Sequence, residues 1–171
     1  IQMNTGFFQG FNGAELFYRE WNFQPNQKNM IIIHRGHEHS ERLNDVAQSQ
    51  EFSKYNVFAF DLRGHGNTKE KTSPDFMDYV RDLDEFSKFL SQKYSVENKD
   101  IFVLANSIGG VIASAWVHDF APQIAGMALL APAFEINLIV PFANEMIGLG
   151  AKLKKDLIIQ SYVKSKMLTH D

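Results

Sequence analysis

The sequence predicts an α/β protein with a mostly parallel sheet and helices on both faces. From residue 30 onwards, short runs of β-branched and aromatic residues alternate with longer amphipathic segments, a pattern typical of strands joined by right-handed crossovers. Several of the short runs are continuously apolar, as in strands buried on both faces. The chain has 171 residues, of which 44% are hydrophobic, enough for one domain with a sizeable core.

The opening element is a predicted hairpin. Strand-like runs at 7–11 and 14–21 flank the pair Asn12-Gly13, and an Asn-Gly pair between such runs is a strong hairpin signal. Strands are then predicted at 30–33 and 55–60. Between them the spacing of apolar residues predicts a helix over 40–53, with Ser40 as its N-cap.

Two longer helices complete the alternation. Apolar residues spaced by three and four predict a helix over 76–94. A further helix over 108–120 lies between strands predicted at 100–104 and 124–130. Residues 1–132 are therefore expected to form the core. Residues 133–171 have no clean strand pattern and are expected to form a segment of a different kind.

Composition excludes several classes of function. The net charge of −3 does not suit a nucleic-acid partner, and the absence of cysteine excludes disulfides, thiolate nucleophiles and iron–sulfur clusters. No apolar run approaches the roughly 20 residues that span a bilayer, and the first residues lack the pattern of a signal peptide. We expect a cytoplasmic protein without a membrane span.

The sharpest motif is Ala105-Asn106-Ser107-Ile108-Gly109-Gly110, where a predicted strand runs directly into a helix. A serine with small residues two places on either side is the pattern of a nucleophile elbow, because strand and helix must approach closely there. The N–H groups at the start of the helix would face the negative charge that develops in an acyl transfer. The alternative is an N-cap serine in an ordinary glycine-rich turn.

The loop after the strand at 30–33 reads His34-Arg35-Gly36-His37-Glu38-His39-Ser40. It lies where an acyl-transfer site needs a second backbone N–H donor. One alternative is a metal site built from the three histidines and Glu38. Another is a structural loop that these side chains hold by hydrogen bonds. We expect no metal and no cofactor.

The loop after the strand at 55–60 reads Asp61-Leu62-Arg63-Gly64-His65-Gly66. Asp61 and Arg63 are expected to form a buried, paired network that positions loops. No Gly-x-Gly-x-x-Gly follows the earlier strand, so a dinucleotide site is disfavoured.

Together these three loops resemble the α/β-hydrolase superfamily, and most closely its monoacylglycerol lipase and lysophospholipase group of serine hydrolases. The resemblance implies that Ser107 is the nucleophile and that the N–H groups of Ile108 and Gly36 form the oxyanion hole. It implies a small-molecule acyl ester of glycerol or of a lysophospholipid as substrate. Arg35 and His37 stand where the family usually has glycine. The sequences of residues 34–40 and 161–171 also resemble those of bacterial hydrolases that are fused ahead of a class I methyltransferase.

The family's catalytic acid and base are not evident. After Ser107 the histidines are His118 and His170, and His118 lies about three turns along the predicted helix, roughly 16 Å away. The resemblance therefore implies a hydrolase fold truncated after about six strands, with 133–171 as the start of a lid and the base beyond it. Such a chain would leave the strand at 124–130 as an open edge. We expect this edge to be protected either by self-association or by residues 133–168 lying over it. The alternative function is a non-catalytic binding module with a hydrolase-like fold.

Overall fold

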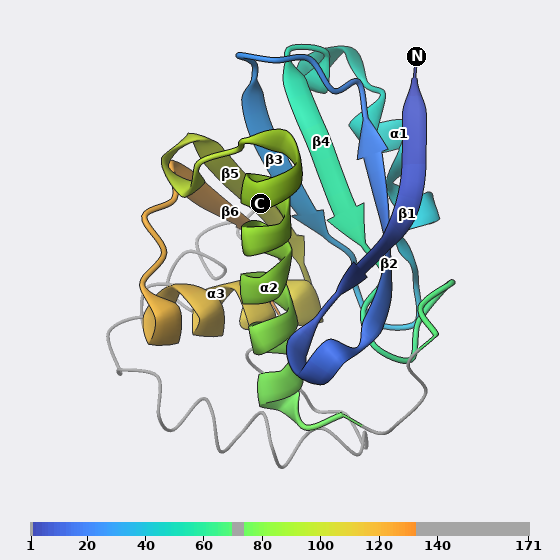
Figure 1. Cartoon of the computed structure of the whole chain (residues 1–171), viewed down its shortest axis with the longest axis vertical. Coiled ribbons are helices and arrows are strands. Elements are labelled where there is room, and N and C mark those ends of the chain that lie inside the picture. The colour runs from blue at the N-terminus through green and yellow to red at the C-terminus, as the bar shows by residue number, and fades with distance from the viewer. Residues whose placement is uncertain (1, 70–73, 133–171) are drawn as a thin grey trace, which may run out of the picture.

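The computed structural model describes residues 2–69 and 74–132, which contain a six-stranded sheet in the order β1-β2-β4-β3-β5-β6 (Figure 1). Strand β3 pairs in parallel with β4 and β5, and β5 pairs in parallel with β6, whereas β2 is antiparallel to both β1 and β4. The predicted α/β fold with a mostly parallel sheet is confirmed. The strands are β1 (Met3–Gln9), β2 (Glu15–Trp21), β3 (Lys28–Ile33), β4 (Tyr55–Phe60), β5 (Ile101–Asn106) and β6 (Gly126–Leu130).

The hairpin prediction is also confirmed, although β1 begins earlier than its apolar run. The two strands pair from Met3 with Trp21 to Gln9 with Glu15. In the connection, Asn12 has φ 56° and Gly13 has φ 72°. Glycine and asparagine are the residues that adopt this left-handed region with the least strain, so the local sequence determines the turn.

Helices α2 (Phe76–Tyr94) and α3 (Ile108–Phe120) contact each other and cover one face of the sheet (Figure 1). Both match the predicted helices at 76–94 and 108–120. Alternate side chains of β3 point to opposite faces: Ile31 and Ile33 belong to the core beneath these helices, while Met30 and Ile32 belong to the core on the other face. This explains the continuously apolar run at 30–33.

The helix predicted over 40–53 is wrong as a continuous element. The segment forms a 3₁₀ turn at Ser40–Leu43, the short helix α1 (Asn44–Ala47) and a second 3₁₀ turn at Gln50–Phe52. Tertiary hydrogen bonds override the local spacing. The N–H of Ser40 donates to Oδ1 of Asp61 at 2.6 Å, the Ser40 hydroxyl accepts from Arg19, and Trp21 donates to Asn44.

Among the described residues, β6 lies at one edge of the sheet, where Leu130 is 51% exposed. An apolar edge strand was predicted here. The predicted lid segment at 133–171, which includes His170, lies outside the described residues.

Candidate active site

Ser107 lies between the end of β5 and the start of α3, with φ 55° and ψ −120°. This is a strained conformation for any residue other than glycine. Its side chain makes no capping hydrogen bond to the helix, which argues against the N-cap alternative. The N–H of Ser107 instead donates to the carbonyl of Leu130 at the end of β6, at 3.0 Å. The geometry is that of a sharp turn which presents a serine hydroxyl at the top of the sheet.

The small residues around Ser107 allow α3 to lie against the end of β3. A Cβ placed on Gly109 would lie 2.9 Å from the carbonyl oxygen of Ile33 and 3.0 Å from that of His34. A real Cβ does not approach backbone atoms so closely, so only glycine fits at this point of contact. Ala105, on the other side of Ser107, is fully buried. The spacing of small residues in the sequence therefore has the steric cause that was expected.

The close approach brings the loop of residues 34–40 against the elbow. A Cβ on Gly36 would lie 3.8 Å from Cγ2 of Ile108. Ile108 is the first residue of α3, and the first N–H groups of a helix have no carbonyl partner one turn earlier. The structure thus brings Ser107, Ile108 and Gly36 together at the carboxyl ends of β3 and β5, where ligands bind in sheets of this kind. Their chemical roles stay predictions.

The two residues that depart from the family pattern each have a local explanation. His37 has φ 61°, a left-handed conformation that glycine would adopt more readily. The Arg35 guanidinium forms an ion pair with Glu38 across the turn, with Nη2 and Oε1 2.7 Å apart. This hydrogen bond lowers the pKa of Glu38 and raises that of Arg35.

His34 is fully buried and uses both ring nitrogens within the protein. Its Nδ1–H donates to the carbonyl of Arg35 at 2.7 Å, and its Nε2 accepts the N–H of Leu62 at 3.0 Å. Burial lowers the pKa of His34 to about 4, so the ring is neutral near pH 7. These contacts support the structural interpretation of the histidine-rich loop. Within residues 2–69 and 74–132, no three His, Asp or Glu side chains are grouped so that they could hold a metal ion.

The loop of residues 61–68 follows β4 and lies next to the 34–40 loop. Asp61 is buried and accepts the N–H groups of Ser40 through Oδ1 and of Asn67 through Oδ2, at 2.6 and 2.8 Å. Gly66, at φ 52°, leaves room for this carboxylate, because a Cβ there would overlap Asp61. The expected pairing of Asp61 with Arg63 is corrected: the carboxylate holds backbone N–H groups of two loops.

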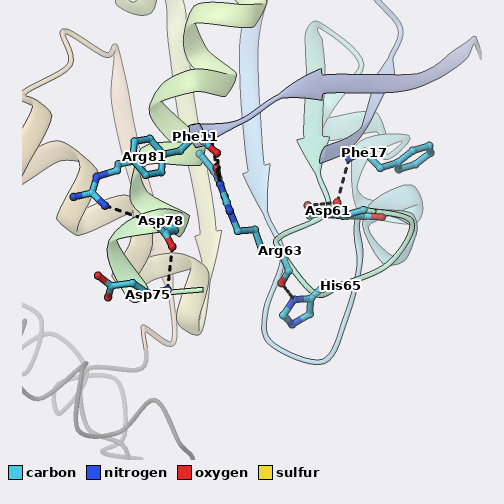
Figure 2. A network of polar contacts seen from close by, with 10 residues as sticks. Phe11, Phe17, Asp61, Arg63, His65, Asp75, Asp78 and Arg81 are labelled. Atoms are coloured by element: carbon cyan, nitrogen blue, oxygen red, sulfur yellow. Dashed lines mark hydrogen bonds and ion pairs between the residues drawn. The ribbon is translucent and has the colours of Figure 1, made fainter. Parts of the chain in front are cut away.

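Arg63 instead pairs with Asp82 of α2, which was not predicted as a site residue. Its Nε and Nη2 donate to the two carboxylate oxygens at 2.6 and 2.9 Å. Arg63 also donates to the carbonyl of Phe11, and the N–H of Phe11 donates to Asp82. Figure 2 shows Arg63 reaching from its loop to Phe11. A charged residue among the apolar positions of the 76–94 pattern was the sequence signal that could have identified Asp82.

No described side chain forms a hydrogen bond with the Ser107 hydroxyl. His118 is a surface residue of α3 whose Nδ1 lies 2.6 Å from Oδ1 of Asp119. A general base for Ser107 is therefore not found in the described part of the chain.

The family model described as serine aminopeptidase, S33, matches residues 24–171. The chain belongs to this family. Its fold is that of the α/β hydrolases, as the three loop motifs predicted.

Two relatives of this chain illustrate the range of similar proteins. Protein YnbC of Escherichia coli, described as uncharacterised, is 40% identical over 169 residues, which are 96% of this chain and 29% of YnbC. The human monoglyceride lipase is 31% identical over 129 residues, which are 74% of this chain and 42% of the lipase. The chain thus spans less than half the length of either relative.

Solved structures are similar in fold. An esterase from Exiguobacterium antarcticum matches 74% of this chain and 45% of its own, with a TM-score of 0.62 and 18% identity. The thioesterase domain of the curacin biosynthetic pathway matches 87% of this chain and 51% of its own, with a TM-score of 0.68 and 18% identity. None of the described helices has the length and apolar character needed to cross a membrane.

Proposed function

We propose that Ser107 is the nucleophile of a serine hydrolase that cleaves carboxylic esters by acyl transfer. The Ser107 Oγ attacks the ester carbonyl carbon while its proton passes to a histidine base. The resulting oxyanion accepts hydrogen bonds from the N–H groups of Ile108 and Gly36. Collapse of this intermediate releases the alcohol, which takes the proton, and leaves an acyl-serine that water hydrolyses.

The strained backbone of Ser107 is the single observation that carries this proposal. Strain at a non-glycine residue persists where the surrounding structure imposes it, and it is common at catalytic positions. Here it occurs beside the start of α3 and the 34–40 loop, so a carbonyl oxygen at Ser107 would meet donors from both. An N-cap serine would require none of these features.

The proposal places the activating histidine and its carboxylate partner outside the described residues. His34 is unsuitable as a base because both of its nitrogens are already used and its pKa is low. His118 faces solvent with Asp119. The order of a hydrolase triad, with acid and base after the serine, fits a base in the later part of the fold.

Labelling with a fluorophosphonate probe tests the nucleophile. The probe would be applied to the 171-residue chain and to versions extended to the length of the relatives, with the modified peptide identified by mass spectrometry. Ser107→Ala is the negative variant. Ser114→Ala is the matched control, because this buried serine of α3 donates to the carbonyl of Gly110 and has no proposed chemical role.

We expect Ser107 to be labelled in the extended versions and much less in the 171-residue chain. Labelling lost in the Ser107→Ala variant and kept in the Ser114→Ala variant would support the proposal. Absence of labelling in every folded version would contradict it and would favour the alternative, a hydrolase-like binding module.

The lipase and lysophospholipase relatives favour a glycerol or lysophospholipid ester as substrate, whereas the family description favours an aminoacyl amide. Turnover of a monoacylglycerol, a lysophospholipid and an aminoacyl amide by the extended protein would separate these classes. We expect the esters to be cleaved fastest. Faster turnover of the amide would replace lipid esters with peptides as the substrate class.

A further inference from the structure

We infer that the 61–68 loop is a positioning element for the oxyanion hole, in which His34 and Asp61 are the residues that fix Gly36 opposite Ser107. The inference rests on the proposed function. Both residues act through the backbone of the 34–40 loop and neither is proposed to touch substrate.

The first attachment is at the start of the 34–40 loop. The His34 ring lies between the two loops, with its Nε2 accepting from Leu62 at 3.0 Å and its Nδ1–H donating to the carbonyl of Arg35 at 2.7 Å. The Arg35 carbonyl belongs to the same peptide group as the N–H of Gly36, and a peptide group is planar. The orientation of the His34 ring therefore restrains the direction of the proposed donor N–H.

The second attachment is at the end of the same loop. Asp61 accepts the N–H of Ser40 at 2.6 Å. The Cβ of His39 also lies close to Gly66, because a Cβ on that glycine would be 2.7 Å away. Between the two attachments, Arg35 and Glu38 form an ion pair. The 34–40 loop is thus joined to the 61–68 loop at both of its ends.

The 61–68 loop is itself held by two other elements. The Asp61 N–H donates to the carbonyl of Phe17 in β2 at 2.8 Å. The N–H of Phe17 in turn donates to the Thr68 hydroxyl at 3.1 Å. Arg63 is paired with Asp82 of α2, and the His65 ring lies 5.4 Å from that of His34. A loop fastened in this way can serve as a fixed support.

The elbow closes the arrangement from the other side. A Cβ on Gly109 would lie 2.9 Å from the carbonyl oxygen of Ile33 and 3.0 Å from that of His34. The start of α3 therefore lies close against the start of the 34–40 loop. Oxyanion stabilisation depends on donor positions within a fraction of an ångström. Loss of one support should therefore affect the rate of acyl transfer more than the binding of substrate.

The test compares His34→Leu with His34→Gln in the extended protein. Leucine fills the buried site without an acceptor, whereas glutamine keeps a polar acceptor within reach of Leu62. His118→Leu is the matched control, since it changes an exposed histidine of α3 that forms a hydrogen bond with Asp119. The readouts are kcat and KM for p-nitrophenyl butyrate, and hydrogen exchange at the amides of Leu62 and Gly36.

We expect His34→Leu to lower kcat by about 10- to 100-fold with KM changed less than about twofold, and His34→Gln to recover most of the loss. Exchange at Leu62 and Gly36 should become faster in His34→Leu only. A full-rate His34→Leu variant, or equal losses in the glutamine and leucine variants, would overturn the positioning role. If His34→Leu does not fold, Asp61→Asn supplies the test with the same two readouts and the amide of Ser40.

The two proposals fail in different ways. If Ser107 proves not to be a nucleophile, kcat has no meaning, but exchange at Leu62, Gly36 and Ser40 still reports whether the 61–68 loop fixes the 34–40 loop. If the unmodified protein shows no catalysis but exchange is faster in the variants, the positioning role of the 61–68 loop is retained and the hydrolase function is rejected. If the variants keep both the exchange rates and the kcat of the unmodified protein, only the positioning role of the 61–68 loop is rejected.

Discussion

His34 shows at the residue scale how burial determines a protonation state. The ring is enclosed between two loops, and burial is the largest cause of its low pKa, about 4 against an ordinary value of 6.5. His65 lowers this pKa further, while the backbone contact to Arg35 and the charges of Asp61 and Glu38 raise it. Burial in the folded protein therefore favours the neutral form of His34.

This protonation state predicts a stability that depends on pH. The unfolded chain takes up a proton at His34 below pH 6.5, whereas the folded chain does so only near pH 4. The stabilising contribution is therefore complete above pH 6.5 and is lost as pH falls from 6.5 through 4, amounting to about 3 kcal/mol. Urea unfolding at pH 7 and pH 4.5 should show a smaller difference for His34→Gln than for the wild-type chain. Equal differences would contradict the prediction.

Gly109 and Gly36 are predicted to differ in their tolerance of a methyl group. In Gly109→Ala the new Cβ would meet backbone oxygens of Ile33 and His34 at 2.9 and 3.0 Å, so we expect a loss of about 1–3 kcal/mol in the free energy of unfolding. In Gly36→Ala the nearest atom is at an ordinary 3.8 Å, so stability should change by less than about 1 kcal/mol. Equal losses in urea denaturation would count against this account of the elbow.

At the element scale, the ion pair between Arg63 and Asp82 fastens three elements that are distant in sequence. Asp82 belongs to α2 and Arg63 to the loop after β4. Both side chains form hydrogen bonds with the backbone of Phe11, which lies in the hairpin connection. Both charges are buried, and removal of one partner of a buried ion pair is strongly destabilising.

We therefore predict that Asp82→Ala lowers the free energy of unfolding by about 3–5 kcal/mol. The double variant Arg63→Met with Asp82→Leu should be much less destabilised, because no buried charge is left alone. Chemical denaturation of the two variants, followed by circular dichroism, measures both. A double variant as unstable as the single one would show that the charges themselves are needed.

The sequence predicted those elements that local patterns specify. Helix α2 has a clear apolar spacing, and the Asn12-Gly13 pair supports its own turn, so both were found. The segment 40–53 was not, because Ser40 and Asn44 bond to residues that become neighbours only in the folded chain. The same division applies to the site. Ser107 lies in a contiguous motif, whereas Asp61 and Arg63 bond to Ser40 and Asp82, which are their neighbours only in the folded chain.

At the scale of the whole molecule, β6 leaves one edge of the described sheet without a partner strand. Unpaired strand edges with apolar side chains promote association. We therefore predict that the 171-residue chain associates with rising concentration and that Leu130→Lys, at an exposed position of β6, weakens this association. Sedimentation velocity over a concentration series measures the effect. Val46→Lys is the control, because Val46 is 41% exposed on α1, away from the edge; an equal effect of both variants would exclude the edge as the contact.

The order of the strands also bears on synthesis at the ribosome. During synthesis β5 emerges after the hairpin, β3 and β4. The hydrogen bonds between the 34–40 and 61–68 loops can therefore form before Ser107 has left the exit tunnel. Strand β5 then enters beside β3, and the hydrogen bond from the Ser107 N–H to the Leu130 carbonyl can form only after β6 has emerged. The hydrogen bonding of the Ser107 turn is therefore complete only after most of the described fold has been synthesised.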